Sequence, residues 1–244
     1  MVILSKKRIN IIVCSLLVSL FAFSFKVAKV PTNNINKEES TVETVALPVT
    51  NKVIVIDAGH GKPDEGAQSS NGTTEAGTNL KIALKLQNLL EQSGAVVVLT
   101  RSDDNAIYDI DAKTLKQKKV SDIRNRVKIG NESSADIFVS IHLNKIQESQ
   151  YWGWQTFYKK DNEQGKALAE SIQNNLNDSI QKDNKRVPMK IDNVYIVKHV
   201  EIPTCIVECG FLSNPEEEQE LLTDTYQDKL SWGIYNGIMN YFNK

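Results

Sequence analysis

Two histidines and a few carboxylates are the side chains of this chain best suited to hydrolytic chemistry. His60 and His142 each stand at the end of a run of apolar and β-branched residues. Such runs are typical of strands in an α/β sheet, where sites form outside the carboxyl ends of the strands. Two neutral imidazoles joined by one carboxylate are a usual ligand set for catalytic zinc. The pattern therefore predicts one zinc ion per domain, at the edge of a sheet.

Three carboxylates compete for the third position in this ligand set. Glu75 is favoured because it follows a polar loop and begins a predicted helix, which anchors it near the edge of that loop. Asp64 and Glu65, in the turn after His60, are rival ligands. A glutamate at the start of a helix can also serve only to interact with the helix dipole. Residue type and position alone leave the choice open.

A further carboxylate, Glu208, ends an apolar run that begins at Thr204. This is an unfavourable place for a charge unless it pairs with a cation or performs chemistry. Zinc lowers the pKa of a water molecule toward about 7. Glu208 would then accept the proton of the attacking water and return it to the departing amine. The alternative role for Glu208 is a salt bridge at the end of the strand.

The order of predicted elements indicates an α/β fold, with a single layered sheet of about six mostly parallel strands flanked by helices. Strands are predicted at 53–57, 95–100, 136–142, 153–158, 194–198 and 204–209. Helices are predicted at 78–92, from Ser121 onward, at 163–181, near 215–222 and at about 226–241. The stretch 102–120, rich in Asp and Lys, is expected to be a surface excursion.

An N-terminal leader is expected to precede this domain. Three basic residues at 6–8 come before an uncharged, mostly apolar run over 9–25. This pattern is typical of a signal peptide or an N-terminal membrane anchor, and it favours export of the domain behind it. We expect a signal peptide or anchor at 1–25, a flexible linker at 26–51 and the catalytic domain at 52–244. The protein would then be extracytoplasmic, either membrane-anchored or secreted.

Charge and cysteine spacing argue against nucleic-acid binding and against a disulfide bond. The net charge is −1, and no basic stripe with interleaved aromatic residues is present, so we do not expect nucleic-acid binding. Cys205 and Cys209 would lie about 13 Å apart in a strand, at roughly 3.3 Å per residue, which exceeds the roughly 7 Å limit for a disulfide. We therefore expect both thiols to pack as small apolar groups.

We expect structural rather than catalytic roles for five other residues. Arg101 and Arg124 are expected to form structural ion pairs, and His199 is expected to lie on the surface or behind the site. Trp152 and Trp154 would share one face of a strand. Packing is the expected role of these two indoles, with stacking against a sugar as the alternative.

The ordered set of motifs resembles the zinc-dependent N-acetylmuramoyl-L-alanine amidases of the amidase-3 type. The matching segments include Asp57-Ala58-Gly59-His60-Gly61, Glu75 with Asn79-Leu80, Ser140-Ile141-His142-Leu143-Asn144, and Val207-Glu208-Cys209-Gly210-Phe211-Leu212-Ser213-Asn214. The resemblance covers residues 53–242. It implies zinc on His60, Glu75 and His142, with Glu208 as the catalytic residue. It also implies cleavage of the amide between the lactyl group of N-acetylmuramic acid and the L-alanine of peptidoglycan stem peptides.

Within this family the chain is most similar to the germination-specific (CwlD-like) sporulation amidases. That similarity implies a role in the maturation of spore cortex. The implied partners are peptidoglycan as the substrate and the membrane through the N-terminal segment. An exported activator protein that completes the site is a further candidate partner.

Two alternatives to the amidase interpretation stay open. A zinc peptidase that cleaves within the stem peptide would use the same chemistry on a different amide. A non-catalytic wall-binding module would tolerate loss of Glu208 or of a metal ligand, yet all four residues are present.

Overall fold

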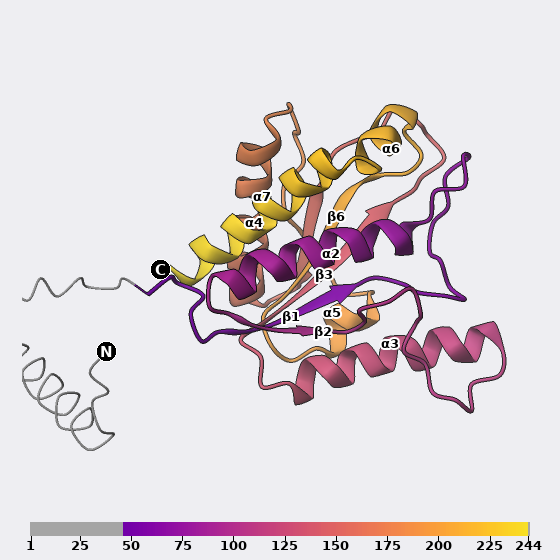
Figure 1. Ribbon diagram of the computed structural model, residues 1–244, viewed down its shortest axis with the longest axis horizontal. Coiled ribbons are helices and arrows are strands. Elements are labelled where there is room, and N and C mark those ends of the chain that lie inside the picture. Colours follow the sequence, from indigo (N-terminus) through magenta and orange to yellow (C-terminus); the bar gives the residue numbers. More distant parts are fainter. Residues whose placement is uncertain (1–45, 244) are drawn as a thin grey trace, which may run out of the picture. The chain divides into compact units, whose positions relative to one another are not determined.

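The structure, a computed structural model, describes residues 46–243, which form a six-stranded sheet flanked by helices (Figure 1). The strand order is β2-β1-β3-β6-β4-β5, and only the β4–β6 pair is antiparallel. The predicted fold class is thereby confirmed. The strands are β1 (Val53–Ala58), β2 (Val96–Leu99), β3 (Ile137–Asn144), β4 (Gln155–Lys159), β5 (Met189–Ile191) and β6 (Thr204–Phe211).

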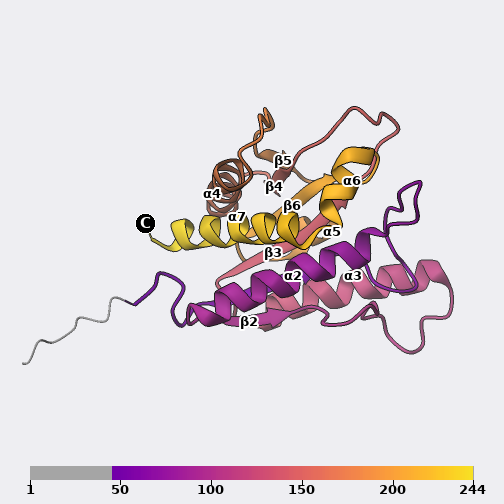
Figure 2. The same cartoon turned by 45° about the horizontal axis from the view of Figure 1, so that its top comes forward.

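The helices divide between the two faces of this sheet. Figure 2 shows α2, α7 and α4 side by side, and their apolar residues share the larger core with one face of the strands. α3 and α5 enclose a smaller core against the other face. The helices are α2 (Glu75–Gln92), α3 (Leu115–Glu132), α4 (Glu163–Ile180), α5 (Tyr195–His199), α6 (Pro215–Leu221) and α7 (Asp224–Phe242).

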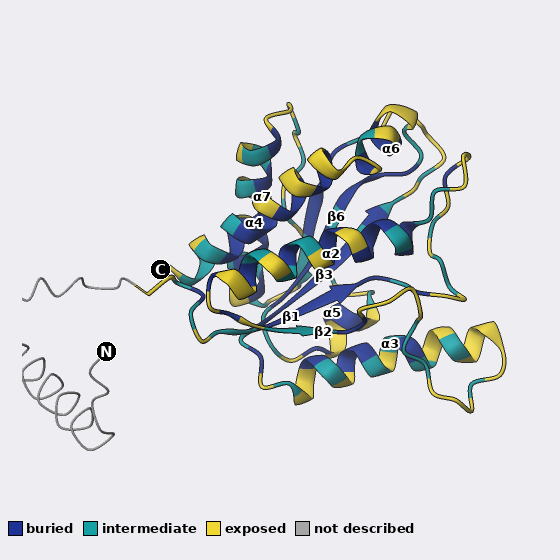
Figure 3. Cartoon of the chain, viewed as in Figure 1, coloured by how far each residue is buried: buried dark blue, intermediate teal, exposed yellow. Residues whose placement is uncertain are grey.

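The central strands are buried on both faces, as parallel strands between two helical layers must be (Figure 3). In β3, Val139 and Ile141 join the larger core, whereas Phe138 joins the smaller one. His142 shares the face of Phe138 by the two-residue period of a strand. The residue paired with His142 on the neighbouring strand β6 is Glu208. The alternation of β3 thus brings these two polar side chains together at one end of the sheet.

The strand predicted at 194–198 is wrong, because these residues form α5. Their β-branched and aromatic composition favours a strand. However, Ile196, Val197 and Val200 are buried, and a short helix that packs against α3 can bury these side chains as well as a strand could. The sixth strand is β5, which the sequence did not reveal. It spans three residues and is mostly exposed, so it carries little apolar signal.

The start of α3 also differs from the prediction. The helix begins at Leu115 rather than after Ser121, so the end of the expected surface excursion is helical. Thr114 and Gln117 form a reciprocal capping box, in which each side chain bonds a backbone N–H at the other residue. The first turns of α3 carry mostly exposed polar residues. Because they form no apolar stripe, the sequence pattern did not indicate a helix there.

The predicted leader at 1–25 lies outside the described residues. None of the helices within 46–243 is long and apolar enough to cross a membrane. Val49, in the segment predicted as linker, is fully buried in the larger core. The backbone N–H of Asn51 donates to the carbonyl of Gly94 over 2.9 Å, which holds this turn against the end of α2.

Glycines allow α4 and α7 to approach closely in the larger core. A Cβ atom built on Gly237 would lie 2.5 Å from the Cα of Ile172, and one on Gly233 would lie 2.9 Å from Leu176. The backbone of α4 cannot yield as a flexible side chain could. The two helices would have to separate to accept even one methyl group.

Gly237→Ala should therefore lower the free energy of unfolding by about 1–3 kcal/mol, the usual cost of overpacking a core. Gly77→Ala in α2 is the matched control, because its added Cβ would meet only the Thr74 hydroxyl at 3.4 Å. It should leave stability unchanged or raise it by up to about 1 kcal/mol, since alanine favours helix. Urea unfolding followed by circular dichroism measures both. Equal effects of the two substitutions would contradict the close helix approach.

Candidate active site

His60, Glu75 and His142 lie together at the carboxyl edge of the sheet. One ligand atom from each lies within 4.8 Å of the other two. His60 Nε2 is 3.2 Å from Glu75 Oε2, and His142 Nδ1 is 2.9 Å from Glu75 Oε1. Ligands on a tetrahedral zinc ion, each about 2.0–2.2 Å from the metal, lie about 3.3 Å apart. The spacing and the nitrogen and oxygen donors therefore fit a zinc ion.

Glu75 is a buried carboxylate that faces histidines rather than a lysine or arginine. Its side chain is about 5% exposed, and it forms no ion pair with Lys or Arg within residues 46–243. Burial opposes its ionisation, but hydrogen bonds with His142 and His60 hold the pKa of Glu75 well below its usual value. Backbone N–H groups of Ala67 and Leu143 also donate to it, over 2.8 and 3.1 Å. Glu75 is thus fixed as an anion that needs a cation between the two imidazoles.

His60 is held between two carboxylates. Its Nδ1 atom is 3.3 Å from Asp64 Oδ2, on the side of the ring away from Glu75. Burial would lower the pKa of His60, yet the hydrogen bonds with Asp64 and Glu75 raise it to about 9. A carboxylate behind a metal-binding histidine orients the ring and increases its basicity. Asp64 occupies this orienting place, and neither it nor Glu65 joins the group that could hold a metal.

Two glycines make room for the group. A Cβ on Gly59 would lie 2.4 Å from the ring of His142, and one on Gly66 would lie 2.5 Å from Glu75 Oε2. Gly66 also has a positive φ of +70°, which a side chain disfavours. The loop after β1 can therefore close over the site only with glycine at these two positions.

Glu208 lies beside the group as the cross-strand partner of His142. Burial, reinforced by the negative charge of Glu75, raises the pKa of Glu208 to about 7, although His142 and His60 oppose the shift. Its Oε2 atom is enclosed and has no hydrogen-bond partner among the described residues. No ion pair to Glu208 forms within 46–243, so the strand-end salt bridge is not found there. An unpaired carboxylate that titrates near neutrality can both accept and release a proton.

Arg126 of α3 holds the backbone that carries His60. Its guanidinium forms a buried ion pair with Asp57, with Nη1 2.6 Å from Oδ1. The same group donates to the carbonyl oxygens of Ala58, over 2.7 Å, and of His60. Asp122, one turn earlier in α3, accepts from its Nε over 2.8 Å. His60 has a φ of +63°, an uncommon conformation for a residue other than glycine, and these bonds support it.

Arg101 links the same loop to the helix that carries Glu75. Its Nε donates to the carbonyl of Ala58 over 2.8 Å. Its Nη2 donates to the carbonyls of Gly59, over 3.0 Å, and of Ala76, over 2.8 Å. The expected ion pair of Arg101 is wrong: this side chain binds carbonyl oxygens instead. Because Gly59 and Ala76 are next to two candidate metal ligands, these hydrogen bonds set the distance between β1 and α2 at the site.

Arg126 was not identified from the sequence. The only local signal for it is Asp122, four residues earlier. This spacing places the two side chains on one face of a helix. It predicts a local ion pair, but it gives no indication that the guanidinium reaches β1.

The other residues singled out from the sequence have structural positions. Trp154 is fully buried and packs in the core, whereas Trp152 is partly buried and lines a cavity. His199 is exposed and stacks on a tyrosine one turn earlier in α5. Cys205 and Cys209 are free thiols that pack in the larger core, as expected.

Arg126→Gln should lower the free energy of unfolding by about 3–5 kcal/mol, because it leaves Asp57 buried without its cation. Arg124→Gln, on the exposed side of the same helix, should change it by less than about 0.5 kcal/mol. Urea unfolding of both variants gives the comparison, and zinc titration should show weaker binding only for the Arg126 variant. A loss below about 1 kcal/mol for Arg126→Gln would show that the ion pair is dispensable.

Comparisons with a protein family, with individual proteins and with solved structures all identify amidases as similar to this chain. Residues 54–240 match the Amidase_3 family, described as N-acetylmuramoyl-L-alanine amidase. The chain is 35% identical over 199 residues to the germination-specific N-acetylmuramoyl-L-alanine amidase of Bacillus subtilis, and the match covers 82% of this chain and 83% of that protein.

Solved structures extend this likeness to three dimensions. The CwlD amidase from Clostridioides difficile, solved in complex with the GerS lipoprotein, has a TM-score of 0.77 and 45% identity over 79% of this chain and 99% of that chain. An N-acetylmuramoyl-L-alanine amidase from Clostridium difficile 630 has a TM-score of 0.70 and 31% identity over 80% of this chain and 98% of that one. The protein belongs to the N-acetylmuramoyl-L-alanine amidase family.

Proposed function

We propose that this protein uses zinc to hydrolyse the amide between the lactyl group of N-acetylmuramic acid and the L-alanine of peptidoglycan stem peptides. The observation that carries the proposal is the convergence of His60, Glu75 and His142 on one point, with the unpaired Glu208 beside them. Family membership supports the choice of bond.

The three converging side chains are the proposed zinc ligands. Two imidazoles and one carboxylate leave a position open for water or substrate, as in catalytic rather than structural zinc sites. When bound, zinc supplies a Lewis acid that polarises the substrate carbonyl and lowers the pKa of water toward about 7. Asp64 keeps the ring of His60 in place from behind.

Glu208 is the proposed proton carrier. Its carboxylate takes the proton of the attacking water at Oε2, which has no competing hydrogen bond within the described residues. It then delivers this proton to the departing amine of L-alanine. Burial brings its pKa to about 7, so both transfers are balanced near neutral pH.

The two alternatives are less well supported. A peptidase acting within the stem peptide would suit the same ligands, but the family and the relatives named above are amidases. A wall-binding module would have no use for a half-buried glutamate whose enclosed Oε2 atom has no partner among the described residues, next to three side chains that could hold a metal. An enclosed polar atom without a partner costs folding free energy, and a catalytic role explains why the chain keeps it.

The relatives also support a biological setting. The germination-specific relative and the CwlD amidase favour spore cortex peptidoglycan as the substrate. The GerS lipoprotein in the complex with CwlD favours an exported lipoprotein as an activating partner of this chain. We propose an extracytoplasmic protein with a signal peptide or membrane anchor at 1–25, a linker at 26–51 whose end packs onto the domain through Val49, and the catalytic domain at 52–244.

Glu208→Ala should abolish hydrolysis and leave zinc binding intact, because the side chain is not one of the three ligands. The measurement is digestion of peptidoglycan with zinc-loaded protein, followed by mass spectrometry of the products. The unchanged protein should release peptides with a free L-alanine amino terminus and leave bare glycan strands.

Each other product pattern has a definite meaning. Cleavage between stem amino acids would make the protein a peptidase. Persistent amide cleavage by the Glu208→Ala protein would refute the role of Glu208. Absence of both cleavage and zinc binding in the unchanged protein would favour the wall-binding alternative.

The rate should rise with pH through the titration of Glu208, because only the ionised carboxylate can accept a proton. Burial places its pKa at about 7, and a bound dication would lower this value, so the ascending limb of kcat/KM should have an apparent pKa at or below about 7. Steady-state rates between about pH 5 and 8 measure it. Zinc content is determined at each pH, since protonation of His60 also releases metal. A flat profile at full zinc occupancy would contradict the assignment.

A further inference from the structure

Arg186 is a cation near the catalytic edge of the sheet without a carboxylate partner among the described residues. It lies between α4 and β5, in a segment that lines a cavity of about 230 Å³ with Tyr151 and Lys185. Lys185 points to Asp183, with Nζ 2.6 Å from Oδ1, so the nearest acidic side chain of this segment is already paired. Within residues 46–243, Arg186 is therefore the positive charge that lines this cavity without a carboxylate partner.

The segment is held in place before any ligand arrives. Asn184 donates from Nδ2 to the carbonyl of Trp154 over 2.7 Å, and its Oδ1 accepts from the backbone N–H of Arg186 over 3.1 Å. Gly153, with a φ of +96°, lets the chain pass close to Asn184. The position of Arg186 is thereby tied to the start of β4.

The guanidinium itself is oriented but not saturated. Its Nε donates to the carbonyl of Trp152 and its Nη1 to Gln155 Oε1, each over 3.3 Å. These bonds use two of the five N–H donors of an arginine, and the other three have no partner among the described residues. The group also lies over the ring of Phe211, 4.7 Å from its centroid. A stacked guanidinium with free donors is suited to bidentate binding of a carboxylate.

Both contacts place Arg186 close to the catalytic residue. Gln155 is the cross-strand partner of Glu208 in the antiparallel β4–β6 pair. Phe211 follows Glu208 by three residues in β6, a distance of about 10 Å at 3.3 Å per residue. An extended peptide covers such a distance in about three residues, and a side-chain or branch carboxylate shortens it. The guanidinium is thus within reach of the first residues of a stem peptide cut next to Glu208.

We propose that Arg186 binds a free carboxylate on the stem peptide, one residue beyond the L-alanine, and so selects acidic over amidated stems. This inference rests on the proposed function and names a feature of its substrate. In stem peptides the second residue is D-glutamate, whose free carboxylate becomes neutral when it is amidated. Arg186 would bind the first form through charge-assisted hydrogen bonds and lose most of that energy with the second.

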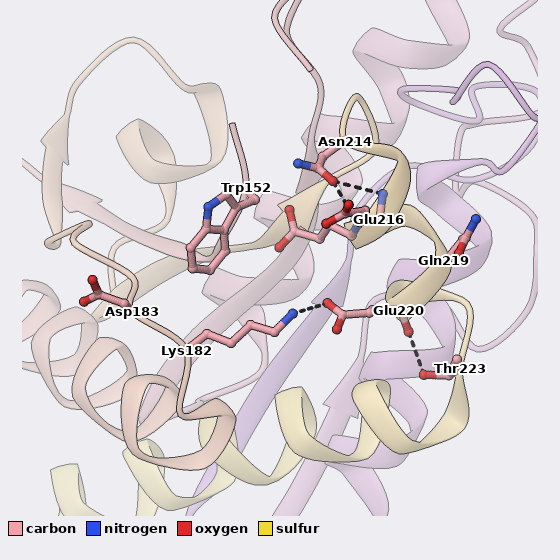
Figure 4. Close-up of a pocket in the computed structure, with 9 residues that line it drawn as sticks. Trp152, Lys182, Asp183, Asn214, Glu216, Gln219, Glu220 and Thr223 are labelled. Atoms are coloured by element: carbon pink, nitrogen blue, oxygen red, sulfur yellow. Dashed lines mark hydrogen bonds and ion pairs between the residues drawn. The ribbon is translucent and has the colours of Figure 1, made fainter. Parts of the chain in front are cut away.

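The larger neighbouring cavity is unsuited to such a group. It measures about 540 Å³, and Figure 4 shows Trp152 and Lys182 among its lining residues. Lys182 is already paired with Glu220. The other charged side chains around it are all carboxylates, namely Asp183, Glu216 and Glu217. This side of Trp152 would repel an acidic stem, which leaves the side of Arg186 to receive it.

The test compares two small substrates in which the γ-carboxyl of D-glutamate is blocked by an amide bond. They are N-acetylmuramoyl-L-alanyl-γ-D-glutamyl-L-alaninamide, whose only free carboxylate is the α-carboxylate of D-glutamate, and its α-carboxamide, which has none. The zinc-loaded protein should cleave the free acid with a kcat/KM at least about tenfold higher, as charged hydrogen bonds of about 1.5–3 kcal/mol imply. Arg186→Gln should remove this preference and leave cleavage of the carboxamide nearly unchanged. Lys185→Gln, a loss of charge at the next residue, should keep the preference, and Arg186→Lys should retain part of it.

A second readout is independent of turnover. Calorimetry with zinc-loaded Glu208→Gln protein should show tighter binding of the free acid, and this difference should vanish when Arg186→Gln is added. Equal rates and equal binding of the two compounds would overturn the inference, as would a preference that survives Arg186→Gln. An equal loss for both compounds would assign Arg186 a bracing role only, and would also overturn it. Failure to cleave either compound would count against the proposed function, while the binding comparison would still decide the role of Arg186.

Discussion

The site depends on the buried ion pair between Arg126 and Asp57. Taking both charges out of water is costly, and their attraction offsets this cost only when the remaining hydrogen-bonding groups are also satisfied. Here they are: Thr100 and Ser140 donate to the carboxylate of Asp57. Burial alone would raise the pKa of Asp57, but Arg126 and these hydroxyl groups hold it low. The remaining donors of Arg126 reach the backbone as far as His60, so the energy of the pair is used to fix the position of a proposed metal ligand.

Two adjacent glutamates of α6 hold other parts of the backbone near the site. Glu217 accepts the backbone N–H groups of Gly153 and Phe211, each over 2.8 Å, and so joins the start of β4 to the end of β6. Glu218 accepts from three polar side chains of the loop 69–73, which leads into α2. Burial raises the pKa of Glu217 to about 7 even though its two N–H partners favour the charged form. Glu217 thus replaces the backbone partners that the ends of these two strands lack, whereas Glu218 holds the loop through its side chains.

The parts of the proposed site that have a local signature can be predicted from the sequence. His60 and Glu208 each follow apolar runs, which mark them as strand-end residues whatever the rest of the fold does. The supports could not be predicted in this way, because Arg126 and Asp57 are 69 positions apart and neither is unusual in its own segment. The error at 194–198 has the same origin. Apolar β-branched residues fit a strand or a short buried helix, and packing against α3 decides between them.

These supports matter because a proton and a metal ion compete for the same place. The carboxylates around His60 raise its pKa to about 9, so near neutral pH a proton is bound where the proposed zinc must coordinate. Metal binding then releases that proton, which lowers the net affinity. The field that attracts the proton also attracts the dication, and more strongly because of its double charge. Since the loop carbonyls are held by Arg126 and Arg101, the ligands need little rearrangement to exchange one for the other. The rigid backbone thus reduces the entropic cost of binding the metal. The electrostatic preference for a dication then decides whether zinc displaces the proton.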